Sequence, residues 1–149
     1  MPVVWNVFHS TREVVISVTG SVLLKEMEEC VDGILTPATR SYRKLVNLVE
    51  GRLALAREDI AALAEYVRER RGPGPMGAVA IAVGSDESEQ QFRLFDSLSV
   101  ADRPLEIFRE LQAARVWLNN QPSLALPTWL EEAKLAAQQD GSSVEAPKA

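Results

Sequence analysis

The sequence offers few side chains of the types that carry out chemistry. Its single histidine is His9 and its single cysteine is Cys30. A transition-metal site without a second histidine or cysteine would need carboxylates alone, which suit hard cations better. His9 is expected to be an exposed turn residue, and Cys30, within a helical pattern, a small buried thiol. Because no convergent acid, base and nucleophile can be assembled, the sequence predicts a non-enzymatic protein with no metal and no cofactor.

The segment 85–89 (Ser-Asp-Glu-Ser-Glu) is the most polar candidate site. It follows an apolar run that predicts a strand, and ligands of open α/β sheets bind beyond the carboxyl ends of strands. Ser85 and Asp86 are therefore candidate ligand- or partner-surface residues. The alternative is helix capping, with Asp86 and Glu89 as a capping pair. The segment has neither the glycines nor the lysine of a phosphate-binding loop.

These residues must be positioned by strands and helices that alternate along the chain. Short β-branched or apolar runs predict strands at 3–8, 14–18, 44–49, 78–83 and 104–108. Apolar residues at helical spacing predict helices at 21–33 and 57–71, a helix carrying Phe92, Phe95 and Leu98, and one carrying Leu111, Ala114, Trp117 and Leu118. The run at 78–83 is apolar on both faces, as in a central parallel strand.

The order β-β-α-β-α-β-α-β-α predicts an α/β fold with a mixed, mostly parallel sheet flanked by helices. We assign residues 1–120 to this domain. Residues 121–140 are expected to form a linker and an amphipathic helical appendage, in which Trp129 and Leu130 make the contact. Residues 141–149 are expected to be a disordered tail.

Several strings resemble the STAS superfamily, specifically its SpoIIAA-like branch of small stand-alone bacterial proteins. They are found at 44–48, 77–83, 92–95, 107–109 and 113–118, and the resemblance covers about residues 3–120. It implies a STAS-like mixed sheet with flanking helices and no known catalytic activity. The branch is also similar in layout to lipid-binding CRAL-TRIO domains, which implies an apolar ligand held between a mobile helix and the sheet.

In the anti-sigma-factor antagonists of the superfamily, phosphorylation of a serine at a helix N-terminus switches partner binding. The matching segment here is 50–59, which contains no Ser, Thr or Tyr. The resemblance therefore does not carry the phosphorylation switch to this chain. It does place Gly51, Arg52 and Arg57 on the corresponding ligand or partner surface.

The charge balance bears on the class of partner. The formal net charge is −5, which argues against nucleic acid, where a positive face supplies most non-specific affinity. No run approaches the roughly 18 apolar residues of a membrane span, so any membrane association would be peripheral. One cysteine and no visible targeting segment predict a cytoplasmic protein.

Two functions stay open at this point. The first is a protein-interaction or regulatory module that lacks the family's phosphorylatable serine. The second is a carrier of an apolar or lipid-like small ligand, whose cavity would lie beneath the helix at 57–71 and be lined by Met27, Leu63 and Phe92. The appendage at Trp129 would pack on its own domain, on a second copy in a homodimer, or on a membrane surface.

Overall fold

Five strands form the central sheet of the computed structural model, which describes residues 2–72, 74–99 and 103–122. The strand order is β1-β2-β4-β6-β7. Only the β1–β2 pair is antiparallel, and the other pairs are parallel. The strands are β1 (Val3–Phe8), β2 (Glu13–Val18), β4 (Arg43–Leu48), β6 (Val79–Val83) and β7 (Leu105–Phe108). The predicted mixed, mostly parallel sheet is therefore confirmed.

A second, two-stranded sheet joins β3 (Gly20–Val22) to β5 (Gly51–Leu53) in parallel. The sequence did not predict these strands, and Ser21, expected at the start of a helix, lies in β3 instead. Gly51 is required here by close packing, because a Cβ at this position would lie 2.6 Å from the carbonyl oxygen of Val18. Strands of three residues leave too short a pattern to detect in a sequence.

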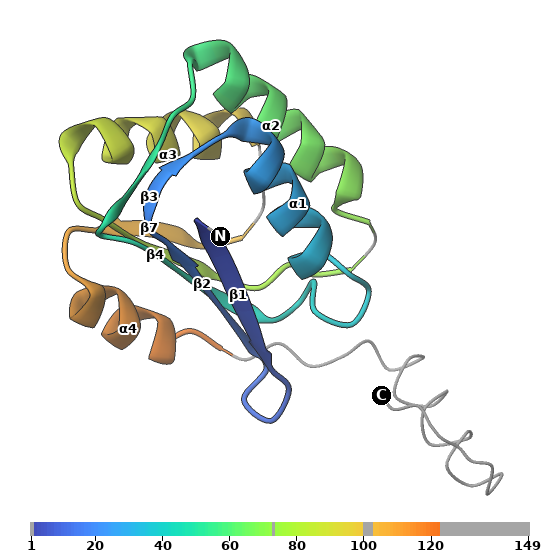
Figure 1. Ribbon diagram of the computed structural model, residues 1–149. Helices are drawn as coiled ribbons and strands as arrows, with labels where there is room; N and C mark the ends of the chain where they lie inside the picture. Colours follow the sequence, from blue (N-terminus) through green and yellow to red (C-terminus); the bar gives the residue numbers. More distant parts are fainter. Residues whose placement is uncertain (1, 73, 100–102, 123–149) are drawn as a thin grey trace, which may run out of the picture.

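Three helices cover one face of the large sheet (Figure 1): α1 (Leu24–Ile34), α2 (Arg57–Arg70) and α3 (Asp86–Ser99). The N-caps of α1 and α2 are Leu23 and Ala56, which have no side-chain acceptor. In each helix the acidic residue three positions on accepts the N-cap backbone N–H instead, at 2.9 Å for Glu26 and 3.0 Å for Asp59. Each helix therefore has one of the two hydrogen bonds of a capping box, the one from the N-cap backbone to the acidic side chain.

The fourth helix, α4 (Leu111–Asn119), lies on the opposite face of the sheet (Figure 1). It packs on β4, β6 and β7. Small side chains make this close packing possible, and the cluster contains Leu45, Ala78, Ala80, Ala82, Ala114 and Leu118. The outward face of β1 and β2 is not covered by α4 in the described part of the chain.

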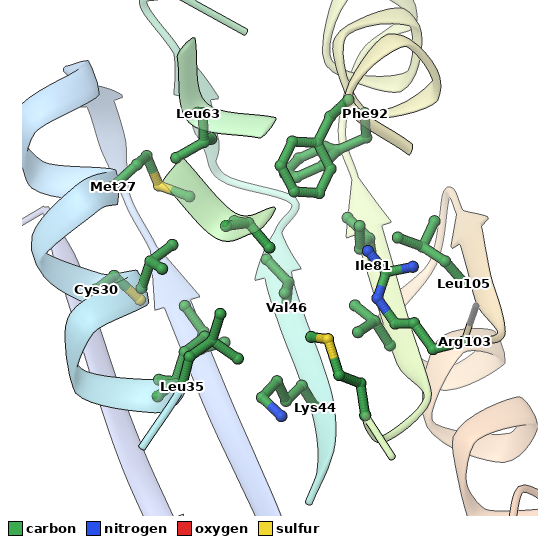
Figure 2. Close-up of a pocket in the computed structure, with 17 residues that line it drawn as sticks. Met27, Cys30, Leu35, Lys44, Val46, Leu63, Ile81, Phe92, Arg103 and Leu105 are labelled. Atoms are coloured by element: carbon green, nitrogen blue, oxygen red, sulfur yellow. The ribbon is translucent and has the colours of Figure 1, made fainter. Parts of the chain in front are cut away.

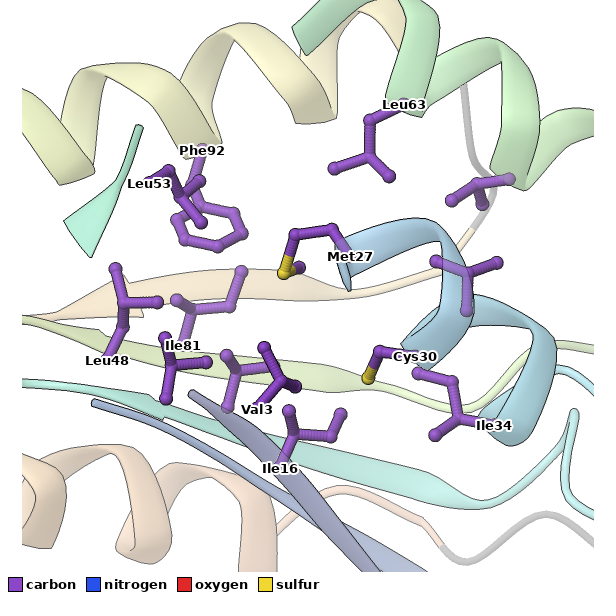
Figure 3. Packing of buried hydrophobic residues seen from close by; sticks show 14 of the residues in the cluster. Val3, Ile16, Met27, Cys30, Ile34, Leu48, Leu53, Leu63, Ile81 and Phe92 are labelled. Atoms are coloured by element: carbon purple, nitrogen blue, oxygen red, sulfur yellow. The ribbon is translucent and has the colours of Figure 1, made fainter. Parts of the chain in front are cut away.

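The larger hydrophobic core lies between the sheet and α1, α2 and α3 (Figure 3). Inward-facing residues alternate along the strands, such as Val14, Ile16 and Val18 on β2, and all three are at most 2% exposed. This core holds the three helices in place. The predicted appendage and tail lie, from residue 123 on, outside the described residues.

Candidate functional site

A cavity of about 90 Å³ lies within this core, between α1, α2, α3 and the sheet (Figure 2). Met27, Leu63 and Phe92, predicted as the lining of a ligand cavity, all line it. The other lining residues are Ile16, Cys30, Val31, Ile34, Leu35, Lys44, Val46, Val67, Met76, Val79, Ile81, Phe95, Arg103 and Leu105. The lining is almost entirely apolar.

Secondary-structure periodicity places these side chains. Met27, Cys30, Val31 and Ile34 share the buried face of α1, and the alternation of the strands turns inward-facing residues of β2, β4 and β6 toward the same space. Val79, Phe95 and Leu105 are only half-buried. The cavity therefore comes nearest to solvent between α3 and the β6–β7 edge.

Lys44 is the first polar group of the lining, and it is only 3% exposed. Its Nζ donates to the carbonyl oxygens of Thr39, Arg40 and Tyr42 at 3.2, 3.1 and 2.9 Å. Burial, with the nearby charges of Arg103 and Arg40, lowers the pKa of Lys44 to about 7. The ammonium thus holds the turn before β4 together at one end of the cavity.

Arg103 is the second polar group, with a side chain 3% exposed. Its Nη1 lies 3.3 Å from Oδ1 of Asp96 on α3. In the described part of the chain, no Asp or Glu side chain lines the cavity. Two cationic groups therefore lie at the edge of an apolar space, and one of them, Arg103, is paired with Asp96.

The Cys30 thiol also borders the cavity (Figures 2 and 3). Desolvation by burial raises its pKa to about 12. The thiol therefore stays protonated at neutral pH and behaves as a small apolar group, as the sequence predicted.

The predicted surface residues of the 50–59 segment lie away from this cavity. Gly51 and Arg52 belong to β5, where Nη1 of Arg52 lies 3.3 Å from Oγ of Ser21 on β3. Arg57 is exposed at the first position of α2. The helix begins at this residue, as the helical spacing predicted, and 51–53 forms a strand before it.

Ser85 and Asp86 lie at the start of α3. Oγ of Ser85 accepts the backbone N–H of Ser88 at 3.1 Å, which is an N-cap hydrogen bond. The predicted Asp86–Glu89 capping pair is wrong, because Ser85 caps the helix, and both carboxylates bind Arg109, which follows β7. Glu89 also pairs with Arg93, with Nη2 and Oε2 at 2.7 Å. Hydrogen bonds from Arg93 and Arg109 lower the pKa of Glu89.

An open polar groove of about 440 Å³ lies at the carboxyl ends of β2 and β4. Its residues include Ser17, Asn47, Glu50 and Arg109. Sequence reasoning missed this groove, and none of the predicted surface residues lines it. Asp86 reaches it only through its ion pair with Arg109.

Nδ1 of His9, exposed in the turn after β1, lies 2.8 Å from the hydroxyl of Tyr42. Within the described ranges, no three His, Cys, Asp or Glu residues lie close enough to hold a metal ion. Trp129 and Leu130 lie outside the described residues. None of the helices in the described part of the chain has the length and apolarity needed to cross a membrane.

Among solved structures, the chain is similar to an uncharacterized protein of the DUF3478 family from Shewanella loihica PV-4, described as having a SpoIIAA-like fold. The sequences are 18% identical, and the TM-score is 0.49 over 78% of this chain and 93% of that one. No protein-family model matches the chain, and no curated protein matches it significantly.

Proposed function

We propose that the protein binds a small apolar molecule in the cavity between α1, α2, α3 and the sheet. The observation that carries this proposal is an apolar void of about 90 Å³ within the core. Protein interiors are packed as densely as organic crystals, and voids larger than a water molecule are few. A ligand would restore the contacts that the lining side chains lack.

The energetic cost of an empty cavity supports this reading. At about 24 cal/mol per Å³, a void of this size destabilises the folded protein by about 2 kcal/mol. Water does not relieve that cost, because an apolar lining gives it too few hydrogen-bond partners. Binding of an apolar molecule would offset the cost and stabilise the folded state.

The size and charge of the lining restrict the ligand. The volume equals about three water molecules in the liquid, so the ligand, or the part of it that enters, is a few carbon atoms long. A longer lipid-like ligand requires α1 or α2 to move. Lys44 and Arg103 disfavour a cation, and the proposed ligand is therefore a neutral or acidic apolar molecule.

A protein-interaction role is the second candidate. It is favoured by the open polar groove at the strand ends, where Arg109 joins α3 to β7 through Asp86 and Glu89. A regulatory partner would bind there without the family's phosphorylated serine. Pull-down with Arg109→Ala as the matched control tests this role, and equal recovery by both forms would count against it.

Methionine methyl NMR tests the cavity proposal in solution. The chain has three methionines, of which Met27 and Met76 line the cavity. With ¹³C-methyl methionine, propane should shift both signals saturably and leave Met1 in place. Butyrate and butylamine then test the preference for an acid over a cation. Val46→Ile with Val67→Ile should weaken propane binding at least about tenfold by filling the space.

Two results would contradict the proposal. One is the absence of a saturable shift at Met27 and Met76 in the wild-type protein. The other is an equal propane affinity in the wild-type and the filled variant, because binding would then take place elsewhere.

A further inference from the structure

Among the described residues, the sheet face opposite α1, α2 and α3 is only half covered. α4 packs on β4, β6 and β7, while the outward side chains of β1 remain open. Val4 and Phe8 are 49% and 47% exposed, although a β-strand that packs on a core on one side commonly carries polar residues on the other. Register places Val15 of β2 opposite Asn6, on the same face.

A groove runs along the side of α4 that faces this open area. Its volume is about 470 Å³, and its lining includes Val15, Asn47, Leu111 and Arg115. Leu111 is 39% exposed. We call Val4, Phe8, Val15 and Leu111, with the groove between the last two, the open half-face.

We propose that residues 128–137 of this chain form a helix that covers the open half-face, beside α4. Their apolar residues are Trp129, Leu130, Ala133, Ala136 and Ala137, which fall on one face of a helix. The alanines permit close approach to the strands, as Ala114 of α4 does on β6. Trp129 and Leu130 supply the bulk that fills the groove.

The position where the described chain ends favours this occupant. Arg43 Nη1 donates to the carbonyl oxygens of Leu118 and Gln121, both at 3.3 Å, and Nη2 to that of Thr11 at 3.5 Å. Residue 121 therefore lies beside the β1–β2 turn, next to the Phe8 end of β1. Figure 1 shows the end of α4 approaching this hairpin.

The lengths of the connecting segment, the proposed helix and β1 are also compatible. Residues 123–127 span up to about 16 Å when extended, which allows the chain to turn back over the hairpin. A helix of ten residues is about 15 Å long, and the six residues of β1 span about 20 Å. The helix would run back along β1 from Phe8 toward Val4. Glu131 and Glu132 would lie near Arg43, because Arg115 is already paired with Glu13, which lies opposite Phe8 on the same face.

Disulfide trapping in the full chain tests this placement. Asn6→Cys with Ala133→Cys would bring two thiols together at the middle of β1. Cys30 stays in place, because its buried, protonated thiol does not compete. The matched control joins Ala133→Cys to Gln90→Cys, an exposed position on α3 across the sheet. Under mild oxidation, the first pair should form an intramolecular disulfide at least about tenfold faster than the control.

When Trp129→Ser and Leu130→Ser are added to the Asn6→Cys and Ala133→Cys variant, its rate of disulfide formation should fall to that of the control pair. Equal rates for the two pairs would overturn the proposal. Disulfide-linked dimers whose yield falls on dilution would also overturn it, in favour of a second copy on the open half-face. Rapid trapping that survives both serine substitutions would show that the apolar face is not what holds the segment.

Discussion

At the scale of single residues, Lys44 is the most unusual group. A lysine loses hydration when it is buried, and here three backbone carbonyls replace the water. Position 44 also alternates with Val46 and Leu48, so it faces the core from β4. In the sequence, a lysine at an inward position of a strand is the signal that could have identified Lys44 as a buried group. This signal was missed.

The lowered pKa of Lys44 predicts how stability depends on pH. The unfolded chain keeps this proton up to about pH 10.5, whereas the folded protein releases it above about pH 7. Between these values the unfolded state binds more protons, so the free energy of unfolding rises with pH. The contribution of this single group is at most about 1.4 kcal/mol per pH unit.

Urea unfolding from pH 6 to pH 10 measures this dependence in the wild-type protein and in Lys44→Met. The stability of the wild-type protein relative to Lys44→Met should increase from pH 7 to pH 10 and stay constant below pH 7. Lys25→Met, at an exposed position of α1, is the matched control. Parallel profiles for the wild-type protein and Lys44→Met would contradict the account.

At the scale of elements, the cavity arises from how the α1, α2 and α3 faces meet the sheet. Two buried valines on adjacent strands show that only some inward positions of the sheet border the cavity. Val46 of β4 lines the cavity, whereas Val14 of β2, fully buried on the same side of the sheet, does not. An extra methylene at position 46 has space to enter, but one at position 14 must displace its neighbours.

Val46→Ile should therefore leave the free energy of unfolding unchanged or raise it by up to about 1 kcal/mol. Val14→Ile should lower it by about 1–3 kcal/mol through overpacking. Urea unfolding of both variants at one pH provides the comparison. Equal destabilisation by the two substitutions would mean that the cavity is not present in solution.

Element prediction succeeded where the sequence pattern was long. The helices around Leu63 and Phe92 and the strands around Val46 and Ile81 follow from apolar spacing, and so does the inward direction of their side chains. The pairing of Gly20–Val22 with Gly51–Leu53 did not follow, because it depends on tertiary contact between two short segments. The binding of both Asp86 and Glu89 to Arg109 was missed for the same reason.

At the scale of the whole molecule, the α/β architecture was predictable and the cavity volume was not. The residues that line the cavity come from α1, α2, α3, the sheet and the loops that connect them. Apolar residues such as Met27 have the same spacing in a sequence whether they enclose a void or fill it. The polar groove at the strand ends likewise depends on loops that only the fold brings together.

The central claim is that the core contains an apolar site for a small ligand. The most direct measurement is a crystal structure of the full chain under xenon pressure, because xenon enters dry apolar cavities of about this kind. One xenon atom should lie in contact with Met27, Val46 and Phe92 in the wild-type protein, and none should bind in Val46→Ile with Val67→Ile. Wild-type crystals with no xenon at this position, and side chains filling the space, would contradict it.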